Sequence, residues 1–310
     1  MGMTVLITGA NGFVGTNIVH ALAADPAFSI VATDMQDMLV RPVDFDAGSL
    51  TYLEGDVSSK EFNDNLRRDF SFDGIIHLAA VLSQAEDMKT YFSVMQSNIY
   101  TTFLLLETAR EHKARFFFPS TAMVYGSNKA PYSEDMQTDP QNFYALSKRI
   151  SEELILFYAR KYGIGYVIFR LGVLYGTWQN EGMFIPSCVS SLVKGKEFPM
   201  TGGDQARDIV FIDDFVDLLR IALGKRDISG TYNVGSGAAP TMKEVALEIE
   251  KLTGAHNKIK PGALPYRDNE LWNYRLDNKK ACRTFNWQPR TNLTEGLKKT
   301  ITHYRQATGR

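Results

Sequence analysis

The sequence contains few of the residues that build disulfide frameworks or metal centres. It has two cysteines, Cys188 and Cys282, and five histidines that show no metal-ligand spacing. Its 34 Lys and Arg residues nearly cancel its 35 Asp and Glu residues, which argues against nucleic acid or an anionic membrane as a partner. No apolar run is long enough to span a membrane, and the chain enters a strand without a cleavable leader. We therefore expect a cytoplasmic, metal-free protein whose partner is a small molecule.

With 310 residues, of which 44% are hydrophobic, the chain can bury a large core. Its first motif is the run TVLITGANGFVG from Thr4 to Gly15. The apolar residues predict a buried strand, and the glycines predict a tight turn into a helix. Such a turn lets the backbone approach a diphosphate, which the helix N-terminus attracts. Taken alone, the spacing GxxGxxG is equally compatible with close packing of the helix on the strand.

Three further segments follow predicted strands, where α/β sheets bind their ligands. Asp34 ends the strand Ile30 to Thr33, about 20 residues after the glycines, which favours the ribose hydroxyls of NAD over the 2′-phosphate of NADP. Asp56 follows the third strand and is equally compatible with an adenine contact and with an ordinary turn. The small residues Ala79 and Ala80 leave room for a flat ring after the fourth strand.

The run from Met88 to Lys113 predicts one long helix with an apolar stripe at turn spacing. Core packing explains most of this stripe, and the remaining apolar surface is a candidate dimer face. Asn98 lies within the stripe, so its amide must bond backbone groups or hold a water molecule.

Tyr144 and Lys148 are four residues apart on a predicted helix and therefore share one face. A lysine ammonium about 5 Å from a phenol favours the phenolate by roughly 3 kcal/mol, or about two pKa units, at an effective dielectric constant near 20. Lys148 is therefore expected to make Tyr144 a usable base, and Thr121, at the end of a strand, can orient a substrate oxygen. The spacing alone also fits a packed ring beside a solvated amine; the preceding glycine turn and Asp34 favour catalysis.

The sequence resembles the extended short-chain dehydrogenase/reductase family, in the branch of nucleotide-sugar epimerases and dehydratases. The resemblance rests on TGANGFVG, GDV at 55–57, HLAA at 77–80, STAMVYG at 120–126, YALSK at 144–148, QARDIVFIDDF at 205–215 and YNVGSG at 232–237. It implies an α/β fold with a Rossmann-type doubly wound parallel sheet and a smaller mixed α/β substrate domain. The implied NAD-binding domain covers 1–172 and about 208–238, and the implied substrate domain covers about 173–207 and 239–310. A homodimer is also implied.

The resemblance also assigns residues to roles. It implies Thr121, Tyr144 and Lys148 as catalytic residues. The implied NAD-binding residues are Gly9, Asn11, Gly12, Phe13, Val14, Gly15, Asp34, Asp56, Val57, Leu78, Ala79, Ala80, Asn98, Tyr144 and Lys148. The implied substrate-binding residues are Arg207 and Arg267, which resemble diphosphate-contacting arginines, and Val173.

Departures from the family pattern narrow the reaction. Dehydratases of this branch carry an Asp-Glu pair after the catalytic threonine, where this chain has Ala122 and Met123, which cannot transfer a proton. The catalytic set of Thr121, Tyr144 and Lys148, without a further acid or base, favours an NAD-dependent nucleotide-sugar 4-epimerase that oxidises and re-reduces the sugar at C4. The close alternative is an NAD(P)H-dependent reductase of 4-keto-deoxysugar nucleotides, because PYRDNELW resembles the end of some CDP-deoxysugar 4-reductases. Val173 and Thr177 replace an asparagine and a proline that epimerases often carry. A non-catalytic dinucleotide sensor is the third reading.

Overall fold

A computed structural model describes residues 2–41, 50–83, 85–267 and 270–307. The chain forms two compact units. The first comprises Met1–Gly126, Gln137–Arg170 and Leu219–Tyr232, and the second comprises Ser127–Met136, Leu171–Leu218 and Asn233–Arg310. Among the described residues, no helix is both long and apolar enough to cross a membrane.

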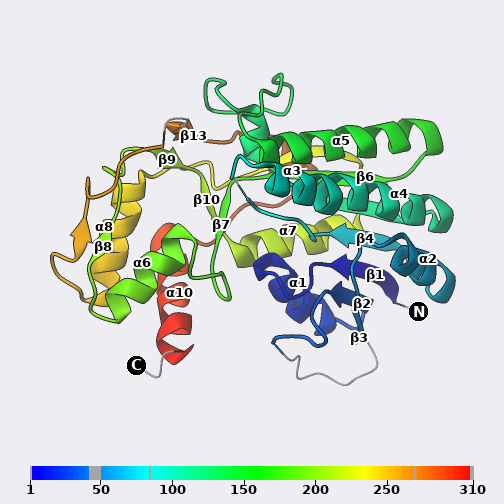
Figure 1. The fold of residues 1–310 in the computed structure, drawn as a ribbon, viewed down its shortest axis with the longest axis horizontal. Helices are drawn as coiled ribbons and strands as arrows, with labels where there is room; N and C mark the ends of the chain where they lie inside the picture. Colours follow the sequence, from blue (N-terminus) through cyan, green and yellow to red (C-terminus); the bar gives the residue numbers. More distant parts are fainter. Residues whose placement is uncertain (1, 42–49, 84, 268–269, 308–310) are drawn as a thin grey trace. The chain divides into compact units, whose positions relative to one another are not determined.

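A seven-stranded sheet forms the centre of the first unit (Figure 1). Its order is β11 (Gly230–Val234), β6 (Tyr166–Leu171), β5 (Arg115–Thr121), β4 (Gly74–His77), β1 (Met3–Thr8), β2 (Phe28–Asp34) and β3 (Leu50–Glu54). The pairs from β5 through β4, β1 and β2 to β3 are parallel. The inner strands are buried along most of their length because helices cover both faces, as parallel sheets require. The doubly wound Rossmann-type fold predicted from the sequence is confirmed.

Helices cover the sheet of the first unit on both faces (Figure 1). One face packs against α2, α4 and α5, whose leucines, isoleucine and tyrosine share an apolar core with β1, β4 and β5. The other face packs against α1 and against the C-terminal end of α7, where Leu223 lies beside Gly74 of β4. The bounds are α1 (Phe13–Ala23), α2 (Lys60–Asp69), α3 (Met88–Val94), the π-helix η1 (Met95–Tyr100), α4 (Thr101–His112), the short 3-10 helix η2 (Ala122–Tyr125), α5 (Phe143–Tyr162) and α7 (Ile212–Gly224).

The long helix predicted over Met88 to Lys113 is interrupted. The π-helix η1 separates α3 from α4, and Asn98 lies inside it. A π-helical turn widens the backbone spiral, a feature that often marks functional sites. The helix ends at Lys113, whose left-handed backbone (φ 55°) stops the helical hydrogen bonding.

The second unit contains short strand pairs and helices. The strand pairs are β7 (Val173–Tyr175) with β10 (Ile209–Phe211), β8 (Phe198–Pro199) with β12 (Ile259–Lys260), and β9 (Ala206–Arg207) with β13 (Asn273–Tyr274). The helices are α6 (Phe184–Val193), α8 (Met242–Thr253), α9 (Lys279–Phe285) and α10 (Leu293–Ala307). Helices α6, α8 and α10 pack on one another (Figure 1). A capping box between Thr241 and Glu244 starts α8.

Candidate active site

The glycine turn between β1 and α1 has the close backbone packing that the sequence predicted. Gly9 has a positive φ of 68°, and Gly12 N donates a hydrogen bond to Gly9 O at 3.1 Å. A Cβ at Gly15 would lie 2.1 Å from Gly9 O, so only glycine lets α1 sit this close to the turn. Gly12 precedes α1 and has no side chain to cap its first turn. The first N–H groups of α1 can therefore bind an anion.

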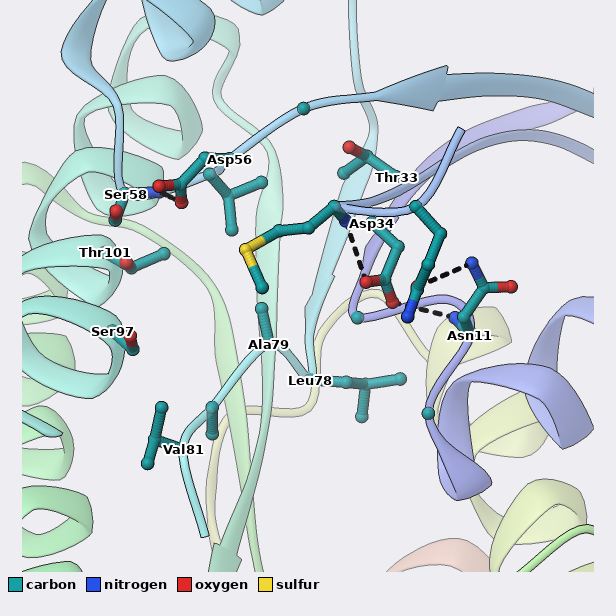
Figure 2. Close-up of a pocket in the computed structure, with 17 residues that line it drawn as sticks. Asn11, Thr33, Asp34, Asp56, Ser58, Leu78, Ala79, Val81, Ser97 and Thr101 are labelled. Atoms are coloured by element: carbon teal, nitrogen blue, oxygen red, sulfur yellow. Dashed lines mark hydrogen bonds between the residues drawn. The ribbon is translucent and has the colours of Figure 1, made fainter. Parts of the chain in front are cut away.

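A cavity of about 310 Å³ opens beside this turn (Figure 2). Nine of the predicted cofactor-binding residues line it: Gly9, Asn11, Gly12, Asp34, Asp56, Val57, Leu78, Ala79 and Ala80. The other six predicted cofactor-binding residues, Phe13, Val14, Gly15, Asn98, Tyr144 and Lys148, are not among the described residues that line it. Gly15 packs against the glycine turn, and Asn98 binds Val81 in the chain after β4. Both residues therefore hold the backbone that lines the cavity in place. The carboxyl ends of β1, β2 and β4 thus meet at one cavity, as the parallel sheet requires.

Sequence reasoning missed eight lining residues. They are Thr33, Met35, Gln36, Gly55, Ser58, Val81, Ser97 and Thr101. Most are direct neighbours of predicted residues and share their loops. Ser97 and Thr101 instead come from the helix that faces the strand ends, on the opposite wall from Asp34 (Figure 2). Their spacing of four residues places both hydroxyls on one helix face, a signal that was present in the sequence.

Asp34 is anchored to the glycine turn. One carboxylate oxygen accepts a hydrogen bond from Asn11 N at 2.9 Å, and the other accepts one from Met35 N at 2.8 Å (Figure 2). A carboxylate has about four acceptor sites, so lone pairs remain for the hydroxyls of a ribose. The Asn11 side chain in turn donates to Met38 O and to Tyr52 Oη, which holds the segment after β2 against the turn.

His77 is a structural histidine. Its Nδ1 lies 3.0 Å from Thr8 Oγ1 and its Nε2 lies 3.1 Å from Thr102 Oγ1. Thr102 Oγ1 donates to Asn98 O at 2.5 Å, so it accepts from His77 Nε2–H. Burial, with a smaller contribution from the charge of Lys148, lowers the pKa of His77 to about 3. The ring is therefore neutral and links β1, β4 and α4.

Asn98 satisfies its buried amide with protein groups. Its Oδ1 accepts from Val81 N at 2.8 Å, while its Nδ2 donates to Val81 O at 3.2 Å and to Ser147 Oγ at 2.9 Å. Ser147 Oγ donates to Tyr144 O at 2.7 Å. Asn98 therefore connects the chain after β4 to the first turn of α5, which carries Tyr144.

The three predicted catalytic residues gather where β5 ends and α5 begins. Thr121 is the last residue of β5, and its Oγ1 accepts from Met123 N at 3.1 Å. Asn142 caps α5, so Tyr144 lies in the first helical turn and Lys148 one turn later. Lys148 Nζ donates to Pro119 O at 3.0 Å, two residues before Thr121, and lies 4.5 Å from the centre of the Phe118 ring.

The ionisation of Tyr144 differs from the sequence prediction. Lys148 was expected to lower the pKa of Tyr144, but burial raises it to about 12. Burial also lowers the pKa of Lys148 to about 8, against the opposing effect of the Glu152 charge. The prediction was wrong here because loss of solvation disfavours both charged forms, and the charge of Lys148 does not offset it at Tyr144. In this structure Tyr144 is a neutral phenol at pH 7, and Lys148 is mainly an ammonium ion.

The residues that follow Thr121 contribute no titratable group. Ala122 and Met123 form the first half of η2, and Ala122 is completely buried. The methyl group of Ala122 and the thioether of Met123 cannot exchange a proton.

The predicted substrate-binding residues lie in the second unit. Val173 begins β7, where its N donates to Asp208 O at 2.8 Å. Arg207 forms an ion pair with Glu270 and donates to the carbonyls of Leu271 and Ala206. Arg267 is exposed. Residues 268 and 269 of the motif PYRDNELW (265–272) lie outside the described residues.

Known proteins resemble this chain over nearly its whole length. A crystal structure of UDP-glucose 4-epimerase from Thermotoga maritima, with UDP-glucose, matches with a TM-score of 0.90 and 26% identity, covering 99% of this chain and 100% of that one. The UDP-glucose 4-epimerase of Thermus thermophilus, in complex with NAD, matches with a TM-score of 0.88 and 26% identity, covering 98% and 100%.

A plant protein with three named activities is also similar to this chain. The trifunctional UDP-glucose 4,6-dehydratase/UDP-4-keto-6-deoxy-D-glucose 3,5-epimerase/UDP-4-keto-L-rhamnose-reductase of Arabidopsis thaliana is 30% identical over 97% of this chain. The chain spans only 47% of the length of that plant protein. The model of the NAD dependent epimerase/dehydratase family matches residues 5–235. The resemblance inferred from the motifs is thus confirmed, and the chain belongs to the NAD dependent epimerase/dehydratase family, whose enzymes use NAD as cofactor.

Proposed function

We propose that the protein is an NAD-dependent nucleotide-sugar 4-epimerase. The observation that carries the proposal is that Lys148, one turn after Tyr144 on α5, binds Pro119 O near the end of β5, where Thr121 is followed in the chain by the proton-inert residues Ala122 and Met123. This set of side chains suffices for oxidation and re-reduction at one carbon, because each step moves only one proton and one hydride.

NAD fits the cavity of the first unit. The backbone of the glycine turn and the uncapped N-terminus of α1 suit a diphosphate, and the free lone pairs of Asp34 suit ribose hydroxyls. A phosphate beside Asp34 would meet its negative charge, which supports NAD over NADP.

The side chains divide the proton chemistry among them. NAD, when bound, supplies the hydride acceptor and donor for C4 and the positive charge of its oxidised ring, which favours the phenolate of Tyr144. Tyr144 Oη takes the proton of the C4 hydroxyl as the ketone forms, and returns it when a hydroxyl of opposite configuration forms. Lys148 stabilises the phenolate through its positive charge, and Thr121 Oγ1 orients the C4 oxygen.

Elimination of water is a poorer match to this site. A 4,6-dehydratase must also remove a proton beside the ketone and protonate the leaving hydroxyl, which requires an additional acid and base. Ala122 is buried and apolar, and Met123 has no ionisable group. Both positions therefore support epimerisation or simple reduction of a 4-keto sugar.

The second unit supplies candidate groups for the nucleotide diphosphate. The guanidinium of Arg207 is four-fifths buried and already paired with Glu270, so its donors are held in a fixed orientation. Arg267 is exposed and carries a second positive charge on the same unit. We propose that both arginines bind the substrate diphosphate, as planar guanidinium groups do, and that Val173 contacts the substrate.

Two measurements test the activity. The dinucleotide released from the denatured protein is identified, and the native protein is then assayed with UDP-, CDP-, GDP- and dTDP-sugars. Isomerisation at C4 without added cofactor supports the epimerase. Stoichiometric consumption of NADH or NADPH with a 4-keto sugar would replace it by the reductase.

The tyrosine provides the mechanistic control. Tyr144→Phe is expected to lower kcat by about 10²- to 10⁴-fold, because general base catalysis is lost. Tyr162→Phe, at the exposed end of α5, is the matched control and should keep wild-type activity. Unchanged turnover of Tyr144→Phe would remove the tyrosine from the mechanism.

We also propose that the protein is a homodimer in the cytoplasm. An apolar groove of about 420 Å³ runs over the outer face of α3, η1, α4 and α5, and it is lined by Phe92, Met95, Gln96, Ile99, Tyr100, Phe103 and Leu154. Phe92 is 66% exposed there, which is unfavourable in a monomer. Phe92→Lys should yield monomers in light scattering, whereas Leu247→Lys on α8 should not.

Both cysteines are free thiols, which suits the reducing cytoplasm.

A further inference from the structure

A buried ion pair lies directly behind the catalytic residues of the first unit. Glu152 on α5 and Arg170 on β6 have side chains that are 1% and 6% exposed. Arg170 Nη2 and Nε donate to the Glu152 carboxylate at 2.7 and 3.1 Å. Burial disfavours the positive charge of Arg170, but the hydrogen bonds and charge of Glu152 outweigh burial and raise the pKa of Arg170. Such a two-pronged pair keeps both partners charged.

Glu152 also accepts from Arg149 Nη1 at 3.4 Å on the same helix, and two further bonds of this pair go to residues on either side of Thr121. Ser120 Oγ donates to Glu152 Oε1 at 2.6 Å, and Arg170 Nη1 donates to Tyr125 Oη at 2.9 Å. Thr121 lies between Ser120 and Tyr125 in the chain. Its backbone is therefore held on both sides by the ion pair.

The same pair lies one helical turn below Lys148. Tyr144, Lys148 and Glu152 follow one another at four-residue intervals on α5, so their side chains lie along one face. Lys148 binds Pro119 O and Glu152 binds Ser120 Oγ, so the two side chains contact consecutive residues of β5.

Few other charges act on Lys148. The titratable or charged groups in its surroundings, among the residues that the structure describes, are Tyr144, Arg149 and Glu152 on α5, His77 on β4, Tyr125 on η2 and Arg170 on β6. Of these, Tyr144 and His77 are neutral at pH 7, because burial shifts the pKa of each away from its charged form. Glu152 thus supplies the negative charge that offsets the loss of solvation of the Lys148 ammonium.

We propose that Glu152, fixed by Arg170, is a positioning residue that holds Lys148 in its ammonium form and fixes the strand end that carries Thr121. The roles of Lys148 and Thr121 rest on the proposed function. A buried ion pair is seldom needed for stability, since apolar side chains of similar size often serve as well. The bonds of this pair to Ser120 and Tyr125, on both sides of Thr121, support a role in the reaction.

The experiment measures the protonation of Lys148 directly. Lysine side chains are labelled with ¹³C at Cε, the Lys148 signal is assigned from its loss in Lys148→Met, and its pH titration is followed by NMR. Glu152→Gln should lower the midpoint by about one pH unit or more, a tenfold change in the protonation equilibrium. Ser120→Ala keeps the charge of Glu152 and should leave the midpoint unchanged. A shift in Glu152→Gln of less than about half a unit would overturn the proposal.

A second variant separates charge from folding. Glu152→Gln leaves Arg170 unpaired and buried, which is destabilising. Glu152→Gln combined with Arg170→Met removes both charges, and it should refold while keeping the lowered Lys148 midpoint. A wild-type midpoint in this folded double variant would show that the pair is only structural. Because NMR needs no turnover, the result stands apart from the nucleotide-sugar assays, whose failure would instead reject the proposed function.

Discussion

Replacing Gly12 by alanine adds one methyl group to the turn and requires only a small shift of the turn backbone. Gly12 has φ −66° and ψ 166°, a conformation that alanine adopts freely. The added Cβ would lie 3.2 Å from Gly9 O and meet no other atom closely. The methyl group would therefore enter the cavity that Gly12 lines, where we place the diphosphate of NAD.

The magnitude follows from the space that the methyl group takes. Forcing an extra carbon into a close contact costs about 1–3 kcal/mol, which corresponds to an increase of about 5- to 150-fold in the Kd for NAD. The free energy of unfolding of the protein without NAD should change by less than about 1 kcal/mol, because alanine also restricts the unfolded chain.

Calorimetric titration with NAD and thermal unfolding without NAD measure the two quantities separately. Gly15→Ala is the contrasting variant: its Cβ would lie 2.1 Å from Gly9 O, so it should lose stability as well as affinity. Gly224→Ala is the matched control, since a Cβ there meets nothing within 4 Å. If Gly12→Ala bound NAD as tightly as the wild type, the proposed binding of the NAD diphosphate at this turn would be refuted.

Three further predictions concern single side chains. Asp34→Ala should weaken NAD binding by about tenfold or more and raise the relative affinity for NADP, measured by competition, because a charged acceptor is lost. His77 has a folded pKa of about 3, below its usual value, so the folded state binds fewer protons than the unfolded state between these values. Stability should therefore fall on acidification from about pH 6.5 towards pH 3, by up to about 1.4 kcal/mol per pH unit more than in His77→Asn; equal slopes would contradict this. Thr241→Ala removes the capping box of α8 and should lower the free energy of unfolding by about 0.5–2 kcal/mol in denaturant titration; no loss would show that the cap is dispensable.

The local pattern of the sequence was sufficient for most elements of the first unit. The predicted strand Ile30 to Thr33 lies within β2, the strand predicted before Ala79 is β4, and the strand predicted to end at Thr121 is β5. Buried parallel strands read as short apolar runs, so their positions follow from composition. The glycine turn and Asp34 were also identifiable, because both depend on a strand end and a short spacing.

Other features depend on contacts between distant segments. Asn98 could be identified as a buried amide, but its bonds to Val81 and Ser147 required the fold. The π-helix around Asn98 leaves no pattern that separates it from an α-helix, so one continuous helix was predicted. Ser97 and Thr101 were missed because only the packing of that helix places them opposite Asp34.

The sequence by itself determined the family, the sheet and the chemical groups at the site, because these follow from residue types at short spacing. Only the tertiary structure decided how those groups ionise. The spacing of Tyr144 and Lys148 indicates attraction between them, but burial, which no spacing records, raises the pKa of one and lowers that of the other. Glu152 on a helix pairs with Arg170 on a strand, 18 residues away in the chain. This pairing could not be predicted from the sequence either. Solvation and long-range pairing are properties of the folded chain, so the sequence identifies the residues and the fold sets their charge.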